Sequence, residues 1–146
     1  WYANQLVSQW EYIKRELRHD RDSRRAVVHI RVPSDSQYNL DVPCTLTLQY
    51  FIRDNKLYAI TSMRSSDIIF GLSYDVPAFT MFQEVLAREL DVDLGTYKHM
   101  SNSLHVYEKQ THKDSKIIIF DGSISILNPR PTEAGSVEEI EGVKTK

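Results

Sequence analysis

Residues 43–63, PCTLTLQYFIRDNKLYAITSM, predict a β-hairpin that follows the only cysteine of the chain. Side chains alternate in polarity from Thr45 to Ile52, which is the pattern of a strand with one buried face. Arg53–Lys56 predicts a turn, and residues 57–63 pair back as the second arm. Pro43 marks the strand entrance, because proline has no N–H to donate to a sheet.

Cys44 stands at the mouth of this strand, where a thiol can face a pocket and stay in place. A fixed thiol is what covalent catalysis requires. The alternative is that Cys44 is a small buried hydrophobic residue, which is common for an isolated cysteine. The residues downstream favour the nucleophile.

Length and composition fit a single globular domain with its own core. The chain has 146 residues, of which 41% are hydrophobic and 26% charged. The net charge of −2 gives no reason to expect a nucleic-acid or membrane partner, and no metal site is predicted. A single cysteine excludes an internal disulfide, so we expect a reducing, cytoplasmic setting. No apolar stretch is long enough to span a bilayer, and no signal peptide is recognised.

Outside the hairpin, the sequence predicts two helices and further strands. Apolar residues recur at helical spacing in the first helix, and Asp75 is expected to cap the second, with Pro77 in its first turn. The predicted elements are a helix at 2–18, strands at 26–32, 45–52 and 57–63, a loop at 64–74, a helix from 75 to about 90, and extended or apolar segments at 97–107 and 117–120.

This mixture predicts an α+β fold, in which a largely antiparallel or mixed sheet is packed by helices. Residues 1–128 are expected to form the domain, and residues 129–146 a poorly ordered tail rich in proline and charge.

Five short motifs, taken in order, resemble the signature of the thymidylate synthase family. The resemblance covers residues 10–107, and the sequence around Asn39–Asp75 is closest to the deoxycytidylate hydroxymethylases of phages. It implies the C-terminal catalytic portion of the family's domain, with the N-terminal part absent. The motifs are Asp22-Ser23-Arg24-Arg25, Pro43-Cys44 with Gln49-Tyr50, Arg64-Ser65-Ser66-Asp67, Gly71-Leu72-Ser73-Tyr74-Asp75 and His105-Val106-Tyr107.

The chemistry of this family requires a thiolate. Carbon 5 of a pyrimidine is a poor nucleophile, but a thiolate that adds at carbon 6 makes carbon 5 able to attack a one-carbon donor. Cys44 is the candidate for this addition, and we expect neighbouring guanidinium groups to favour its thiolate form. The resemblance implies that Arg64 touches both the thiolate region and the substrate phosphate, and that Ser65 adds a hydroxyl to the same phosphate.

Arg24 and Arg25 have two interpretations. They can be a solvated pair at the start of a strand. The resemblance instead implies that they reach the phosphate of the substrate bound to a neighbouring subunit, which predicts a homodimer with shared active sites.

The remaining motif residues are implied to contact the sugar and the folate. His105 and Tyr107 share one face of a strand and are either ordinary strand surface or partners of the 3′ hydroxyl. Asp67 is either a turn former or a contact to the pteridine of 5,10-methylenetetrahydrofolate. Gly71 and Tyr74 are implied to line the same cleft.

Asp75 is the informative departure from the family pattern, because the thymidylate-forming members carry asparagine there. An ionised aspartate faces O4 of uracil with a second acceptor, whereas it accepts readily from the 4-amino group of cytosine. Cytosine N3 is also an acceptor, so one proton must be shared between N3 and Asp75. The alternative is that Asp75 only caps a helix.

Three functions therefore stay open. The first is hydroxymethylation of dCMP with methylenetetrahydrofolate, the second is formation of dTMP from dUMP, and the third is a non-catalytic nucleotide-binding or structural module. The family's upstream phosphate-binding arginine, its catalytic glutamate and an aromatic residue that packs on the folate cannot be assigned in this chain.

Overall fold

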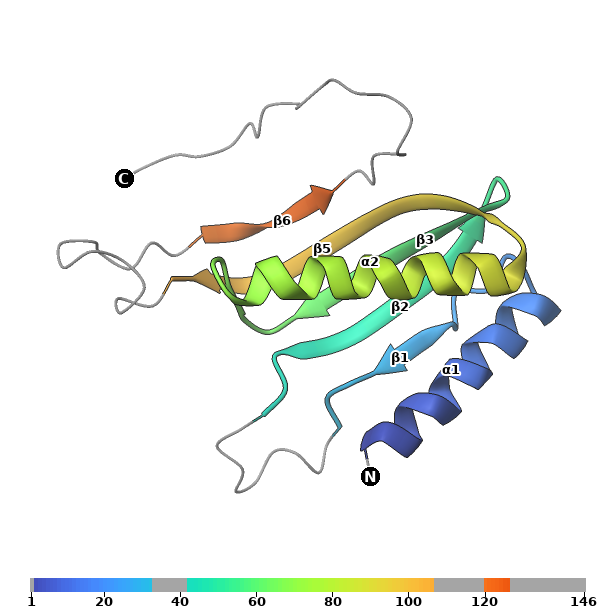
Figure 1. The fold of residues 1–146 in the computed structure, drawn as a ribbon, viewed down its shortest axis with the longest axis horizontal. Coiled ribbons are helices and arrows are strands. Elements are labelled where there is room, and N and C mark those ends of the chain that lie inside the picture. Colours follow the sequence, from blue (N-terminus) through green and yellow to red (C-terminus); the bar gives the residue numbers. More distant parts are fainter. Residues whose placement is uncertain (1, 33–41, 107–119, 127–146) are drawn as a thin grey trace, which may run out of the picture.

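The computed structural model describes residues 2–32, 42–106 and 120–126, which form two helices and one mixed sheet (Figure 1). The predicted α+β class is confirmed, and the predicted tail at 129–146 lies outside the described residues. The elements in chain order are α1 (Tyr2–His19), β1 (Val27–His29), β2 (Thr45–Arg53), β3 (Lys56–Met63), β4 (Ser66–Asp67), α2 (Gly71–Leu90), β5 (Asp93–His105) and β6 (Phe120–Ile126).

The hairpin of β2 and β3 forms as predicted. Arg53 pairs with Lys56, which leaves a two-residue turn between the strands. Asp54 and Asn55 take left-handed backbone conformations with φ of 49° and 58°, as both central residues of a type I′ turn must. Aspartate and asparagine tolerate this region better than other residues with a Cβ, so the local sequence fixes the register of the hairpin.

The sheet has parallel and antiparallel pairs. Its strand order is β1-β2-β3-β5-β4, and β6 also pairs with β5. β5 runs parallel to β3 and β4, whereas β1–β2, β2–β3 and β5–β6 are antiparallel. Parallel neighbours need a crossover connection, and α2 provides it between β3 and β5.

Both helices pack on one face of the sheet. Figure 1 shows α2 lying across the strands, with α1 beside it near β1. Alternate residues of β2 and β3 are buried against the helices, which explains the alternating polarity of the sequence. The buried apolar core comprises Ile13 and Leu17 of α1, Leu86 and Ala87 of α2, and Ala26, Val28, Leu48, Tyr50, Ile52, Leu57, Ala59 and Tyr97 from the sheet and its approach.

The start of α2 differs from the prediction. The helix begins at Gly71, so Asp75 lies inside it and the prediction that Asp75 caps the helix is wrong. Pro77 is likewise inside the helix rather than in its first turn. Asp67 organises the turn before the helix instead, because its Oδ1 accepts the N–H groups of Ile69 at 2.7 Å and Phe70 at 3.3 Å.

Strand β1 is shorter than predicted, and β5 begins earlier. The carbonyl of Leu46 accepts the N–H groups of both Ile30 and Arg31, where the register of β2 shifts, so regular pairing stops at His29. β5 extends from Asp93 to His105, and β6 begins at the end of the predicted apolar run, of which residues 117–119 lie outside the described part of the chain.

None of the helices in the described ranges combines the length and the apolar character that a membrane crossing requires.

Gly95 allows β3 and β5 to approach each other, and its replacement should destabilise the fold. A Cβ there would lie 2.9 Å from the Leu57 carbonyl oxygen and 3.0 Å from the Tyr58 ring. We expect Gly95→Ala to lower the free energy of unfolding by about 1–3 kcal/mol, measured by urea denaturation.

Gly71→Ala is the matched control, because its Cβ would meet no atom closer than 3.4 Å. Its effect should stay within about 0.5 kcal/mol. Equal losses in the two variants would contradict the role of Gly95.

Candidate active site

The structure brings several of the predicted site residues to one edge of the sheet. β3, β4 and β5 are parallel, so their carboxyl ends meet there. Cys44 immediately precedes the antiparallel β2 at the same edge, and α2 begins beside it. Ligands of open sheets bind at such carboxyl edges, which also gather the loops that carry reactive side chains.

Cys44 and Arg64 are neighbours across the end of the hairpin. Thr45 pairs with Met63, and the Arg64 N–H donates to the Cys44 carbonyl at 2.9 Å. The Arg64 guanidinium reaches back along the segment before the cysteine, donating from Nε to the Pro43 carbonyl at 3.2 Å and from Nη2 to the Val42 carbonyl at 2.8 Å. A guanidinium has five N–H donors, so Arg64 can hold this segment and still bind an anion.

The thiol of Cys44 is exposed. The alternative that it is a buried hydrophobic residue is therefore wrong. An exposed thiol at a fixed backbone position can add to an electrophilic carbon of a bound molecule.

Ser65 and His105 meet at the same edge. The parallel pairing of Asp67 with His105 places the end of β5 beside the residues that follow Arg64. Ser65 Oγ lies 3.2 Å from His105 Nδ1, within hydrogen-bond distance. Both side chains are partly exposed. Tyr107, the predicted companion of His105, lies outside the described residues.

The first turns of α2 complete the edge. A Cβ on Gly71 would lie 3.4 Å from both Asp67 Cβ and Ser66 Oγ and 3.7 Å from Asp75 Oδ2, so these side chains surround the glycine. Tyr74 is 73% exposed and available for contact. Asp75 is half-buried, and this burial raises the pKa of its carboxyl.

A buried polar cluster that the sequence analysis missed lies nearby. Tyr97 contacts Thr61 Oγ1 at 3.0 Å and His99 Nδ1 at 2.9 Å. Burial is the main reason that the pKa of Tyr97 rises to about 12, and Asp75 adds to it. The sequence did contain a signal for this cluster. Thr61, Tyr97 and His99 are polar, although they stand at the buried positions of their strands, where the other residues are mostly apolar.

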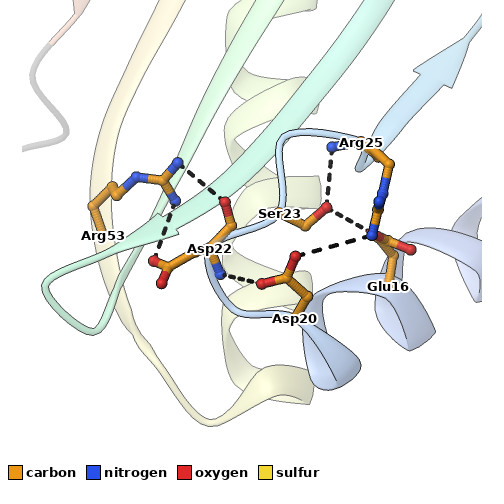
Figure 2. Close-up of polar contacts among 6 residues, drawn as sticks. All are labelled: Glu16, Asp20, Asp22, Ser23, Arg25 and Arg53. Atoms are coloured by element: carbon orange, nitrogen blue, oxygen red, sulfur yellow. Dashed lines mark hydrogen bonds and ion pairs between the residues drawn. The ribbon is translucent and has the colours of Figure 1, made fainter.

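Arg24 and Arg25 do not join Cys44 within one chain. They precede β1 beside the far part of β2, where the Arg24 carbonyl accepts from Gln49. Figure 2 shows Arg25 pairing with Glu16, whose carboxylate also accepts from Ser23. The Arg25 Nη2–Glu16 distance is 2.7 Å, and this pairing raises the pKa of the Arg25 guanidinium.

The same contacts tie the end of α1 to the start of β1. Ser23 donates to Glu16 at 2.6 Å, and this hydrogen bond, together with Arg25, lowers the pKa of Glu16. Arg53 adds a second link through the backbone carbonyl of Asp22 at 3.3 Å (Figure 2). Arg25 therefore has a structural partner in its own chain.

The family model described as thymidylate synthase matches residues 2–119. The chain belongs to the thymidylate synthase family. Over 113 residues it is 32% identical to a Methanocaldococcus jannaschii protein assigned to the thymidylate synthases, a match that covers 73% of this chain and 50% of that protein. It is 28% identical over 105 residues to the thymidylate synthase of Bacillus licheniformis, which covers 72% of this chain and 38% of the relative.

A solved structure shows the same fold. Thermostable thymidylate synthase A from Bacillus subtilis matches with a TM-score of 0.65 and 24% identity, covering 70% of this chain and 37% of that chain. The predicted thymidylate synthase-like fold is thereby confirmed. The chain spans half or less of the length of each of these thymidylate synthase relatives.

The exposure of Cys44 predicts a reactive thiol in the folded protein. We expect one equivalent of thiol per chain to react with a disulfide reagent such as Ellman's at a rate within about tenfold of the rate in denaturant. The reaction is followed by absorbance under both conditions. A native rate slower by orders of magnitude would show that the thiol is buried.

Proposed function

We propose that the chain carries the thiolate half of a one-carbon transfer site. In this reaction, carbon 5 of dCMP takes a one-carbon unit from 5,10-methylenetetrahydrofolate, and the product is the hydroxymethyl nucleotide. The observation that carries the proposal is the exposed Cys44 thiol next to Arg64, at the edge where Ser65, His105 and Asp75 also lie.

The Cys44 thiolate would add to carbon 6 of the base, which places negative charge on the ring and makes carbon 5 nucleophilic. Carbon 5 would then attack the one-carbon unit of the folate and lose its proton, and tetrahydrofolate would leave as the carbon–nitrogen bond breaks. Water would add to the exocyclic methylene to give the hydroxymethyl group, and expulsion of the Cys44 thiolate would restore the aromatic ring. Arg64 suits the first step because its guanidinium, held against the segment before Cys44, can bind an anionic substrate close to the thiol.

Phosphate and sugar recognition would come from the neighbouring side chains. The planar guanidinium of Arg64 can take two phosphate oxygens, and Ser65 can donate to a third. His105 would then bind the sugar 3′ hydroxyl, and its contact with Ser65 keeps the two groups adjacent. Tyr107 is proposed for the same hydroxyl on the family resemblance alone.

Asp75 would select the base. Its position in α2, half-buried beside Gly71, suits a contact to a ring that lies over the helix start. Burial raises its pKa, so the carboxyl holds a proton to higher pH than an ordinary aspartate. A proton shared with cytosine N3, together with acceptance from the 4-amino group, satisfies both partners.

The folate would lie on the other side of the same helix start. Tyr74 is exposed there, and Gly71 leaves room for a flat ring system. Asp67 is a turn former, as the two backbone N–H groups on its Oδ1 demonstrate. We propose that the turn it fixes also presents Asp67 to the pteridine.

The active unit is proposed to be a homodimer in which Arg24 and Arg25 reach the partner's phosphate. Their distance along β2 from Cys44 suits a role in another chain's site. The sheet face opposite the helices bears Phe51 stacked on Tyr58, with ring centroids 5.4 Å apart, which gives a second copy an apolar surface. In the dimer, Arg25 would give up its ion pair with Glu16 and bind the phosphate instead. A protein that binds nucleotide as a monomer would contradict this arrangement.

Base choice tests the proposed substrate. If Asp75 recognises cytosine, dCMP should bind more tightly than dUMP, and Asp75→Asn should reverse the preference. A mismatched buried hydrogen bond costs about 1–3 kcal/mol, so the ratio of dissociation constants should change roughly tenfold to a hundredfold. Calorimetry on the wild type and the variant measures both constants, and the dCMP affinity of the wild type should fall as pH rises above the pKa of the shared proton.

Asp91→Asn is the matched control, because it makes the same substitution at the other end of α2 and asparagine tolerates the left-handed conformation there. It should leave both affinities unchanged. A wild type that prefers dUMP would favour formation of dTMP. Equal affinity in the wild type and in Asp75→Asn would exclude base recognition by Asp75 and favour a nucleotide-binding module without this chemistry.

A further inference from the structure

Three buried polar side chains form a hydrogen-bonded chain beside Asp75. The Tyr97 hydroxyl donates to Thr61 Oγ1 at 3.0 Å and lies 2.9 Å from His99 Nδ1. All three side chains are almost completely buried. The parallel pairing of β3 with β5 sets Thr61 opposite His99, so the sheet itself assembles this chain.

The direction of the hydrogen bonds determines which nitrogen of His99 carries a proton. A tyrosine hydroxyl has one proton, and Tyr97 gives it to Thr61. The Tyr97 oxygen is then an acceptor, so His99 Nδ1 is the protonated nitrogen and Nε2 has a lone pair. Burial lowers the pKa of His99, which keeps the ring neutral at pH 7.

His99 Nε2 is a buried acceptor with no hydrogen-bond partner among the residues that the structure describes. An acceptor of this kind costs free energy until a donor reaches it. Helix α2 covers the ring, with Phe79 against His99 at a centroid distance of 6.5 Å. Asp75 precedes Phe79 by one helical turn on the same face, and its charge acts on Tyr97.

We propose that the Thr61–Tyr97–His99 chain is a positioning element for Asp75, in which the lone pair at His99 Nε2 favours the form of the Asp75 carboxyl that carries a proton. A single bridging water can complete the contact. In nucleotide-free protein the carboxyl donates its one proton toward His99 Nε2. When cytosine binds, the same proton turns to N3 while the other carboxyl oxygen accepts from the 4-amino group. The link to the base rests on the proposed function, whereas the effect on Asp75 is a property of this chain without nucleotide.

The other titratable groups around Asp75 do not account for this preference by their charge alone. β5 contributes Tyr97 and His99, and β2 contributes Tyr50, which interacts with Tyr97. Burial raises the pKa of both tyrosines, which keeps both hydroxyls neutral at pH 7. Asp67 also borders Gly71, and its Oδ1 accepts two backbone N–H groups. Burial already raises the pKa of Asp75, and the proposed contact with His99 Nε2 would raise it further.

Thr61→Val tests the inference while leaving Tyr97 and His99 in place. Valine has the shape of threonine but cannot accept the Tyr97 proton, so Tyr97 donates to His99 Nδ1 and Nε2 becomes the protonated nitrogen. An N–H at Nε2 cannot accept the Asp75 proton, so the proposed preference for the protonated carboxyl is lost. The titration midpoint of Asp75, followed by carbon-13 NMR of its carboxyl in nucleotide-free protein, should therefore fall by about one pH unit, the effect of one hydrogen bond.

Tyr97→Phe is the second variant. It removes the hydroxyl between Thr61 and His99, so the proton of His99 is no longer held at Nδ1, and the Asp75 midpoint should fall in the same direction. Tyr50→Phe is the matched control, because it removes the hydroxyl of a buried tyrosine from β2, the strand next to β3. It should leave the titration midpoint of Asp75 unchanged. Nitrogen-15 spectra of the imidazole should show Nδ1 protonated in the wild type and Nε2 protonated in Thr61→Val.

An Asp75 midpoint that is the same in the wild type, Thr61→Val and Tyr97→Phe would overturn the positioning role. A wild-type His99 protonated at Nε2 would overturn it as well. Midpoints that shift as expected, in a protein that binds dCMP and dUMP equally, would support the positioning role and show that the base-reading function fails. The two proposals are thereby tested separately.

Discussion

The antiparallel pairing of β2 with β3 is the constraint on which the candidate site depends. Its register places Cys44 opposite Arg64, and the Arg64 guanidinium then holds the segment before the cysteine. A slip of one residue would turn every side chain of β2 to the other face and expose the core. The hydrophobic pattern that buries Leu48, Tyr50 and Ile52 therefore also fixes the thiol.

The crossover through α2 adds the remaining groups. Because β3, β4 and β5 are parallel, one connection carries Ser65, Asp67, Gly71 and Asp75 back to the edge where β5 delivers His105. Gln83, from the middle of α2, donates to the carbonyls of Leu57 on β3 and Gly95 on β5, which holds the helix over both strands. The core thus sets the position of the helix start.

The sequence predicted the hairpin and both helices because these depend on local signals, namely alternation, helical spacing and turn residues. The site motifs were indicated by the family resemblance, and the roles of their residues stay predictions. The sequence analysis misplaced the start of α2, since an aspartate before a proline resembles a cap. Only the structure shows that the helix begins at Gly71, after a turn that Asp67 fixes. The sequence analysis missed Thr61, Tyr97 and His99, because polar residues at inward strand positions acquire meaning only when two distant strands pair. The family match covers residues 2–119, whereas the roles of individual residues still depend on experiment.

The most direct test of the central claim, that Cys44 activates carbon 5 of a pyrimidine nucleotide, is release of tritium from carbon-5-labelled dCMP and dUMP. The wild type with methylenetetrahydrofolate should release tritium to water, faster from dCMP, because the thiol adduct makes the carbon-5 hydrogen exchangeable. Cys44→Ser should release none from either nucleotide. Equal release by the wild type and Cys44→Ser, or no release by the wild type, would contradict the account.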